Sequence, residues 1–198
     1  MERRLSSMPL GGVMIAAMAA PLMAQVVQAA TAQPKYPLDI AVTYSAMRSN
    51  IVTGGSFWMQ GGSVQVHAQF YRGFGVVEDV AGVHTGNMSS TGVELDLVTA
   101  TFGPRYTWSP SHRKYAFFGQ AMVGEAFGFN SAFPATGGAM DSDDGLALKI
   151  GGGMNVALSP RVALRTFETD WLHAQLPNST TNVQNTFQLS TGLVFRFH

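Results

Sequence analysis

Six positions in the sequence carry charged or amide side chains that would face an enclosed space if their segments form strands. They are Asp79, Arg105, Gln120, Lys149, Arg165 and one of the two carboxylates Glu168 and Asp170. Such a set can form an ion path or a proton relay, or it can form a plug of hydrogen-bonded ion pairs. A barrel of eight strands encloses little more than side-chain volume, and buried charges must pair. We therefore predict that this set is a structural polar plug.

The five histidines give little support to catalysis or metal binding. They are His67, His84, His112, His173 and His198, and no His-Glu-x-x-His spacing or cysteine accompanies them. His84 and His173 would lie at the outer ends of their strands. Ser89, Ser90 and Glu125 would lie at the same height. A Ser-His-acid set there would resemble a lipid A deacylase, but the Gly-x-Ser-x-Gly elbow is missing. We expect interfacial polar residues, no enzyme, no metal and no cofactor, and a lipid-modifying enzyme remains the alternative.

Two further stretches suggest ligands less directly. The acidic run 141–145 (DSDDG) offers carboxylates to Ca²⁺, but it lacks the twelve-residue spacing and closing Glu of a calcium loop. We interpret it as a solvated loop. The stretch 54–59 (GGSFWM) is the most apolar of the predicted outer loops. It would contact a partner or lipopolysaccharide, or fold over the mouth of the barrel.

Hydrophobic alternation indicates the elements that must position these residues. From Phe187 to Phe197, every second residue is large and apolar or a threonine, and the residues between them are mostly polar or small. Strict alternation predicts a strand with one apolar and one polar face. The predicted strands are 38–47, 63–70, 74–84, 95–107, 115–127, 146–156, 161–173 and the C-terminal stretch 185–198.

The connections between these strands alternate in length. The short turns are 71–73, 108–114 and 157–160. The long loops are 48–62, 85–94, 128–145 and 174–183, and they are rich in Gly, Ser, Asn and Asp. Short turns at one end and long loops at the other are typical of outer-membrane barrels. We predict an all-β fold: an eight-stranded antiparallel up-and-down transmembrane β-barrel with short periplasmic turns and four longer outer loops.

The polar faces of the strands point to the lumen in this arrangement. Gln65, His67, Lys149 and Asn155 lie on such faces. Charged residues make up only 12% of the chain, against ~25% in soluble domains. Lipid-facing positions tolerate charge poorly, which explains the low value. A soluble, lipocalin-type carrier would place the apolar faces inside and bind an apolar ligand there, and we regard it as the less favoured alternative.

Aromatic residues are expected to form two rings around the barrel. Near the short turns we place Tyr106, Trp108, Tyr115, Phe117, Phe195 and Phe197. Near the long loops we place Phe127, Phe129 and Trp171. Paired aromatic girdles mark the two membrane interfaces of outer-membrane barrels.

The spacing of the charged residues predicts irregularities in two strands. Glu78 and Asp79 are adjacent, and successive side chains in a strand point to opposite faces. We expect a bulge there, or one carboxylate at the interface. Arg165 and Asp170 lie five positions apart, so in a regular strand their side chains would point to opposite faces. A bulge or register change near Phe167 would bring Glu168 or Asp170 inside together with Arg165.

The N-terminus predicts export. A basic start is followed by the apolar run 10–24 and by the small-residue cleavage candidate Ala30-Thr31-Ala32, as in a secretory signal. The run is shorter than the ~20 residues of a spanning helix. We therefore expect a signal peptide over 1–32, Sec-type export, and an outer-membrane β-barrel domain over 33–198. Lys+Arg and Asp+Glu are 12 each, so no basic excess exists to bind nucleic acid.

Several motifs carry a resemblance to a known family. They are Thr101-Phe102-Gly103-Pro104-Arg105-Tyr106, Gly151-Gly152-Gly153 before Leu158-Ser159-Pro160, Arg165 followed by Asp170-Trp171, and Gly192-Leu193-Val194-Phe195-Arg196-Phe197. Over about residues 36–198 the chain resembles the small eight-stranded barrels of the outer-membrane β-barrel domain family, and it is similar to the transmembrane domain of outer-membrane protein A. The resemblance implies a monomer in the outer membrane, in contact with lipid and lipopolysaccharide, with a structural or surface-binding role.

The resemblance also implies a partner for the C-terminal strand. In this family the barrel-assembly machinery reads the last strand, and the matching residues here are Gly192, Leu193, Phe195 and Phe197. The family signal usually ends on an aromatic residue, whereas here Phe197 is penultimate and His198 follows.

Overall fold

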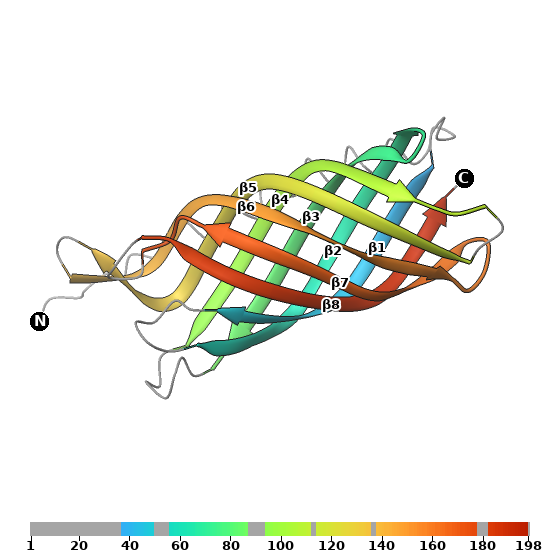
Figure 1. Ribbon diagram of the computed structural model, residues 1–198. Helices are drawn as coiled ribbons and strands as arrows, with labels where there is room; N and C mark the ends of the chain where they lie inside the picture. Colours follow the sequence, from blue (N-terminus) through green and yellow to red (C-terminus); the bar gives the residue numbers. More distant parts are fainter. Residues whose placement is uncertain are drawn as a thin grey trace, which may run out of the picture. The chain divides into compact units, whose positions relative to one another are not determined.

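The computed structural model describes residues 37–49, 56–86, 94–111, 114–135, 138–177 and 182–197. They form a closed antiparallel barrel whose strands pair in sequence order (Figure 1). The strands are β1 (Leu38–Ser49), β2 (Phe57–Tyr71), β3 (Phe74–Thr85), β4 (Leu95–Trp108), β5 (Tyr115–Ala135), β6 (Gly138–Ala157), β7 (Val162–Ala174) and β8 (Gln184–Phe197). The prediction of eight strands in an up-and-down barrel is confirmed.

The first and last strands close the barrel. β1 pairs with β8 from Leu38 opposite Phe197 to Ser49 opposite Thr186. Within the described chain every strand therefore has two neighbours, which removes the free edges that an open sheet exposes. No helix in the described ranges is long and apolar enough to cross a membrane. The predicted signal peptide, 1–32, lies outside the described residues.

The side chains alternate between lumen and exterior as the sequence pattern predicts. In β1, Thr43 and Ser45 are buried inside the barrel, while Val42 and Tyr44 are half exposed on the outer surface. The same alternation along the other strands leaves Phe102, Ile150 and other large apolar side chains outside. This arrangement is the reverse of a soluble barrel with an apolar interior.

Two predicted loops are largely strand. β2 begins at Phe57, so the last three residues of the stretch 54–59 lie in a strand, and residues 54 and 55 lie outside the described ranges. Phe57 and Met59 point into the lumen and Trp58 points outward, because strand alternation continues through them. The expectation of an apolar loop there was wrong for these three residues.

The predicted loop 128–145 is a β-hairpin extension. β5 and β6 continue past the other strands and remain paired, with Phe129 opposite Ser142 and Phe133 opposite Met140. A register shift between these pairs includes Asn130, whose φ is +54°. The acidic run 141–145 therefore lies in a strand instead of a solvated loop. No cluster of possible metal ligands occurs among the described residues.

The two predicted irregularities have different outcomes. β3 pairs regularly with β4 through Glu78 and Asp79, so no bulge lies there and the two carboxylates face opposite sides. Asp79 is fully buried in the lumen, whereas Glu78 lies on the outer surface. In β7, Asn155 pairs with Arg165 but Met154 pairs with Phe167. This bulge lies where it was predicted, and it brings both Glu168 and Asp170 inside.

Aromatic side chains gather on the outer surface near the short turns. Phe74 packs against Tyr106 with ring centroids 4.7 Å apart, and Trp108 stacks on Phe117 at 6.0 Å. Tyr115 meets the same Phe117 edge-on at 5.6 Å. Aromatic side chains at this height are typical of a membrane interface.

Candidate functional site

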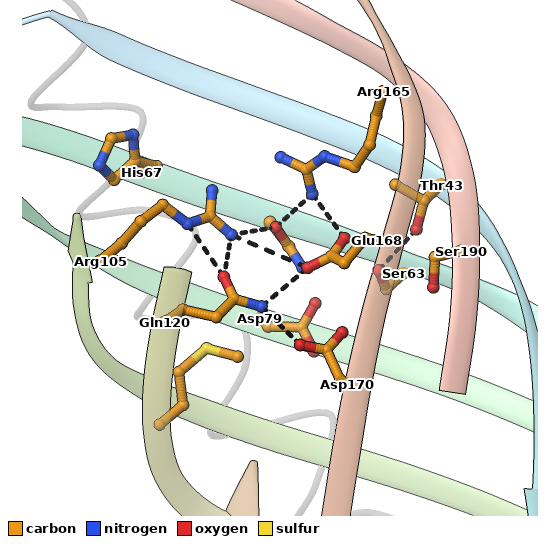
Figure 2. A network of polar contacts seen from close by, with 12 residues as sticks. Thr43, Ser63, His67, Asp79, Arg105, Gln120, Arg165, Glu168, Asp170 and Ser190 are labelled. Atoms are coloured by element: carbon orange, nitrogen blue, oxygen red, sulfur yellow. Dashed lines mark hydrogen bonds and ion pairs between the residues drawn. The ribbon is translucent and has the colours of Figure 1, made fainter. Parts of the chain in front are cut away.

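Charged and amide side chains gather inside the barrel, and Figure 2 shows the polar contacts around Arg105, Gln120 and Glu168. All of the residues predicted from the sequence are buried in the lumen and are at most 6% exposed: Asp79, Arg105, Gln120, Lys149, Arg165, Glu168 and Asp170. They come from β3, β4, β5, β6 and β7, and β2 adds Gln65. Three cations and three carboxylates are enclosed together, so their formal charges balance.

One ion pair crosses the lumen. The Lys149 Nζ on β6 lies 2.6 Å from the Asp79 Oδ2 on β3, and neither side chain is exposed. These strands are not neighbours in the barrel. The pair therefore ties opposite parts of the wall together, at a distance typical of a charge-assisted hydrogen bond.

The bulge in β7 places a second ion pair. Arg165 Nη1 donates to Glu168 Oε2 at 2.7 Å and to Gln65 Oε1 at 2.5 Å, while its Nε donates to Asn155 Oδ1 at 3.1 Å. In a regular strand, Arg165 and Glu168 would point to opposite faces. The extra residue in β7 allows both side chains to enter the lumen.

Gln120 links the cationic and anionic parts of the network. Its Oε1 accepts hydrogen bonds from the Arg105 guanidinium, whose Nη2 also donates to Gln65 Oε1 at 2.6 Å. Its Nε2 donates to Glu168 Oε1 at 2.8 Å and to Asp170 Oδ1 at 2.9 Å. An amide suits this position because it both donates and accepts.

An aromatic ring that was not predicted from the sequence supports both arginines. The centroid of the Phe118 ring lies 4.4 Å from the Arg105 Cζ and 4.7 Å from the Arg165 Cζ. Phe118 is 6% exposed. Phe118 lies two positions before Gln120 in β5, so the two side chains face the same side of the strand. This spacing was the sequence signal that could have placed Phe118 in the lumen. A cation over an aromatic face is stabilised most when it is desolvated.

Glycine makes room for the network at its most crowded point. A Cβ on Gly151 would lie 2.2 Å from the Asp170 Oδ1 and equally close to the Thr169 carbonyl oxygen. Any larger residue at Gly151 would therefore displace the Asp170 carboxylate or the wall of β7.

An apolar layer that was not predicted from the sequence fills the part of the lumen nearest the long loops. Its buried members are Met47, Phe57, Met59, Val83, Leu95, Leu97, Ala126, Phe133, Ala147, Leu172, Ala174 and Leu176. Met47 and Leu97 have the same strand parity as the polar lumen residues Thr43 and Thr101. The inward face thus changes from polar to apolar along single strands.

The histidines singled out from the sequence lie at the outer ends of their strands. His84 Nδ1 lies 2.7 Å from Asp96 Oδ1, and the other oxygen of Asp96 accepts from Asn130. His173 Nδ1 lies 2.9 Å from Asn185 Oδ1. The carboxylate at His84 is Asp96 and not the expected Glu125. Ser89 and Ser90 lie outside the described residues.

These features define a class of protein. A closed eight-stranded antiparallel barrel with a charged lumen, an apolar exterior and an aromatic ring has the fold of the small outer-membrane β-barrels. No protein-family model and no curated protein matches the sequence.

Three solved structures show the same fold. The crystal structure of Neisserial surface protein A is 14% identical with a TM-score of 0.62, covering 80% of this chain and 96% of that one. Ail of Yersinia pestis, in complex with the heparin analogue sucrose octasulfate, is 17% identical with a TM-score of 0.55, covering 82% and 99%. OprG of Pseudomonas aeruginosa is 10% identical with a TM-score of 0.51, covering 82% and 96%.

Proposed function

We propose that the chain is a non-enzymatic outer-membrane barrel with a sealed lumen and a binding role at its outer end. The observation that carries this proposal is the filling of the lumen in two layers. Two ion pairs, Lys149 with Asp79 and Arg165 with Glu168, are fully buried in the lumen. The apolar layer lies between these pairs and the long-loop end of the barrel. An ion crossing this barrel would have to break both pairs and then enter an apolar section.

Bilayer conductance tests the sealed lumen. We expect the purified barrel to give no discrete current steps in planar bilayers, in contrast to a general porin reconstituted in the same way. Slower gel migration of the boiled sample relative to the unboiled one verifies that the protein used for reconstitution is a folded barrel. Regular steps from the unmodified chain would contradict the sealed lumen.

Fractionation tests the location. We expect the protein in the outer-membrane fraction, with a gel mobility that changes on boiling, because a closed barrel resists unfolding in detergent. Recovery in the soluble periplasmic fraction would contradict both the membrane assignment and the proposed contacts with outer-membrane lipid and lipopolysaccharide.

The charge at the outer end indicates the chemistry of a binding partner. Described acidic residues there are Glu94, Asp96, Asp141, Asp143 and Asp144, and Arg48 is the described cation. Ail was solved with a sulfated heparin analogue, whereas this outer end would repel such a ligand. We therefore favour cationic partners.

Binding of a lysine-rich peptide to barrels in nanodiscs tests this preference. We expect binding that weakens with salt and with the triple variant D141N/D143N/D144N, while heparin does not bind. The variant R161Q, altered at the opposite end of the barrel, provides the control. Equal binding of the peptide by the triple variant would contradict the proposal.

A lipid-modifying enzyme remains a second candidate because of His84. Its Nδ1 contacts Asp96 at 2.7 Å and its side chain is 56% exposed, as expected of a base oriented by a carboxylate. Replacing His84 and His173 would change the lipid A mass spectrum if this candidate is correct. An unchanged spectrum would eliminate it.

A further inference from the structure

An apolar groove lies on the outer surface at the short-turn end of β2, β3 and β4. Its volume is about 490 Å³, and its side-chain walls come from Phe70, Tyr71, Phe74, Val76, Phe102 and Pro104. None of these side chains points into the lumen. The groove therefore opens toward whatever surrounds the barrel.

The groove results from side-chain size along the paired strands. Val76 of β3 lies opposite Pro104 of β4, and both are short. On one side of this row Phe74 packs against Tyr106 at 4.7 Å. On the other side Phe102 rises from the wall with 58% exposure. The two short side chains between these larger rings leave an apolar channel along the outer surface.

A cation is held at the mouth of this groove. Arg72 lies in the turn between β2 and β3 with a φ of +41°. Its Cζ lies 5.3 Å from the centroid of the Tyr71 ring, and Tyr71 is part of the groove wall. The guanidinium is therefore held next to the apolar channel, at the end of the barrel where the short turns lie.

We propose that this groove and Arg72 bind one anionic glycerophospholipid of the inner leaflet. An acyl chain fills the channel and the phosphate pairs with Arg72. This inference rests on the proposed outer-membrane location, which places the short turns at the phospholipid headgroups. Arginine suits a phosphate because its guanidinium can donate two parallel hydrogen bonds. The adjacent aromatic rings suit the boundary between headgroup and hydrocarbon.

Native mass spectrometry of the detergent-purified barrel with added phosphatidylglycerol tests the site. We expect one tightly retained lipid per barrel, and about five-fold weaker retention in R72Q, as for the loss of one basic residue near an anionic headgroup. The matched control is R161Q, because Arg161 lies in another short turn, is exposed and does not line the groove. It should bind as the unmodified chain does.

Two further measurements separate the acyl chain from the phosphate. V76W would fill the channel and abolish retention, provided that its gel shift on boiling shows a folded barrel. Excess inorganic phosphate should not displace the lipid, because phosphate lacks the acyl chain. Displacement by phosphate alone, or equal retention by R72Q and R161Q, would overturn the proposal.

The failure of this inference can be distinguished from failure of the proposed function. A protein that reaches the outer membrane but retains no lipid overturns the groove site alone. A protein that does not reach the outer membrane overturns the proposed function as well.

Discussion

At the residue scale, Glu78 has an unusual environment. It lies on the outer surface in the middle of β3, between Val66 of β2 and Phe102 of β4. Within the described part of the chain its carboxylate makes no hydrogen bond or ion pair. A carboxylate facing lipid is destabilising, although less so than a lysine or arginine.

Replacing Glu78 by leucine should therefore stabilise the barrel in lipid. We expect the free energy of unfolding of E78L to rise by about 1–2 kcal/mol, on the order of the cost of an acidic side chain in the apolar band. Urea unfolding in vesicles, followed by tryptophan fluorescence, measures the change. E125L is the comparison, because Glu125 faces outward beside the loop-end half of β4. A loss of stability in E78L would show that Glu78 has a partner in the membrane.

In the buried pair of Lys149 and Asp79, by contrast, removing a single charge should lower the free energy of unfolding. K149M would leave the Asp79 carboxylate buried without a cation, which costs about 3–5 kcal/mol. The double variant K149M/D79L should regain most of that stability, since it removes both charges. The same unfolding assay applies. R48Q serves as control, because among the described residues the Arg48 side chain donates its hydrogen bonds to the exposed Ser56. An additive loss in the double variant would contradict pairing.

At the element scale, the bulge in β7 is the feature that assembles the network. Register shifts relative to both neighbours lie between Arg165 and Glu168. Thr166 and Phe167 together lie opposite one residue of β8. The side chains before and after the bulge that face the lumen therefore continue to face it. The bulge thus follows from the need to place Arg165, Glu168 and Asp170 in the same lumen.

Deleting Phe167 should therefore be tolerated. The deletion converts the bulge into a regular strand and leaves Arg165, Glu168 and Asp170 all facing inward, since side chains alternate with period two. We expect a barrel that still shows the gel shift on boiling. Deleting Val80 from the regular strand β3 is the matched control. That deletion moves every following side chain of β3 to the other face, and the barrel should not form.

Alternation and charge spacing were enough to predict the strands, their facing and this bulge. Asp79, Arg105 and Lys149 could be predicted because each is a charged residue on the polar, lumen-facing side of an alternating strand. Phe118 and the apolar layer were missed because an apolar residue at an inward position looks like a break in the pattern. The β5–β6 extension was missed because Gly, Ser and Asp predict loops, whereas pairing between the two strands overrides that preference.

At the scale of the whole molecule, charge is separated between the two ends of the barrel. The described residues near the short turns include Arg72, Lys114, Arg161 and Arg196, with Asp39 as their counterpart. The outer end carries the acidic residues, and the lumen is balanced. The zero net charge of the sequence is therefore the sum of a basic end and an acidic end, which match the proposed anionic lipid and the proposed cationic partner, respectively.

The C-terminal strand should govern assembly of the whole barrel. F197A removes an outward aromatic side chain at the end of β8, where the resemblance implies recognition by the barrel-assembly machinery. We expect less protein in the outer membrane, and more in the periplasm, after a pulse of synthesis. F74A, altered in β3 at the same end of the barrel, is the control for loss of an aromatic ring. Equal membrane levels of both variants would contradict a special role for Phe197.

The pairing of β1 with β8 also sets the moment at which folding can finish. Leu38 pairs with Phe197, so the first described strand has no final partner until β8 has been made and delivered. The closing loop spans nearly the whole domain, and its entropy cost grows only slowly with length. A chain whose synthesis stops early has two unpaired strand edges and never reaches the closed state. Because of this topology, only a chain that includes β8 can close the barrel, and a truncated product stays open and exposed to proteolysis.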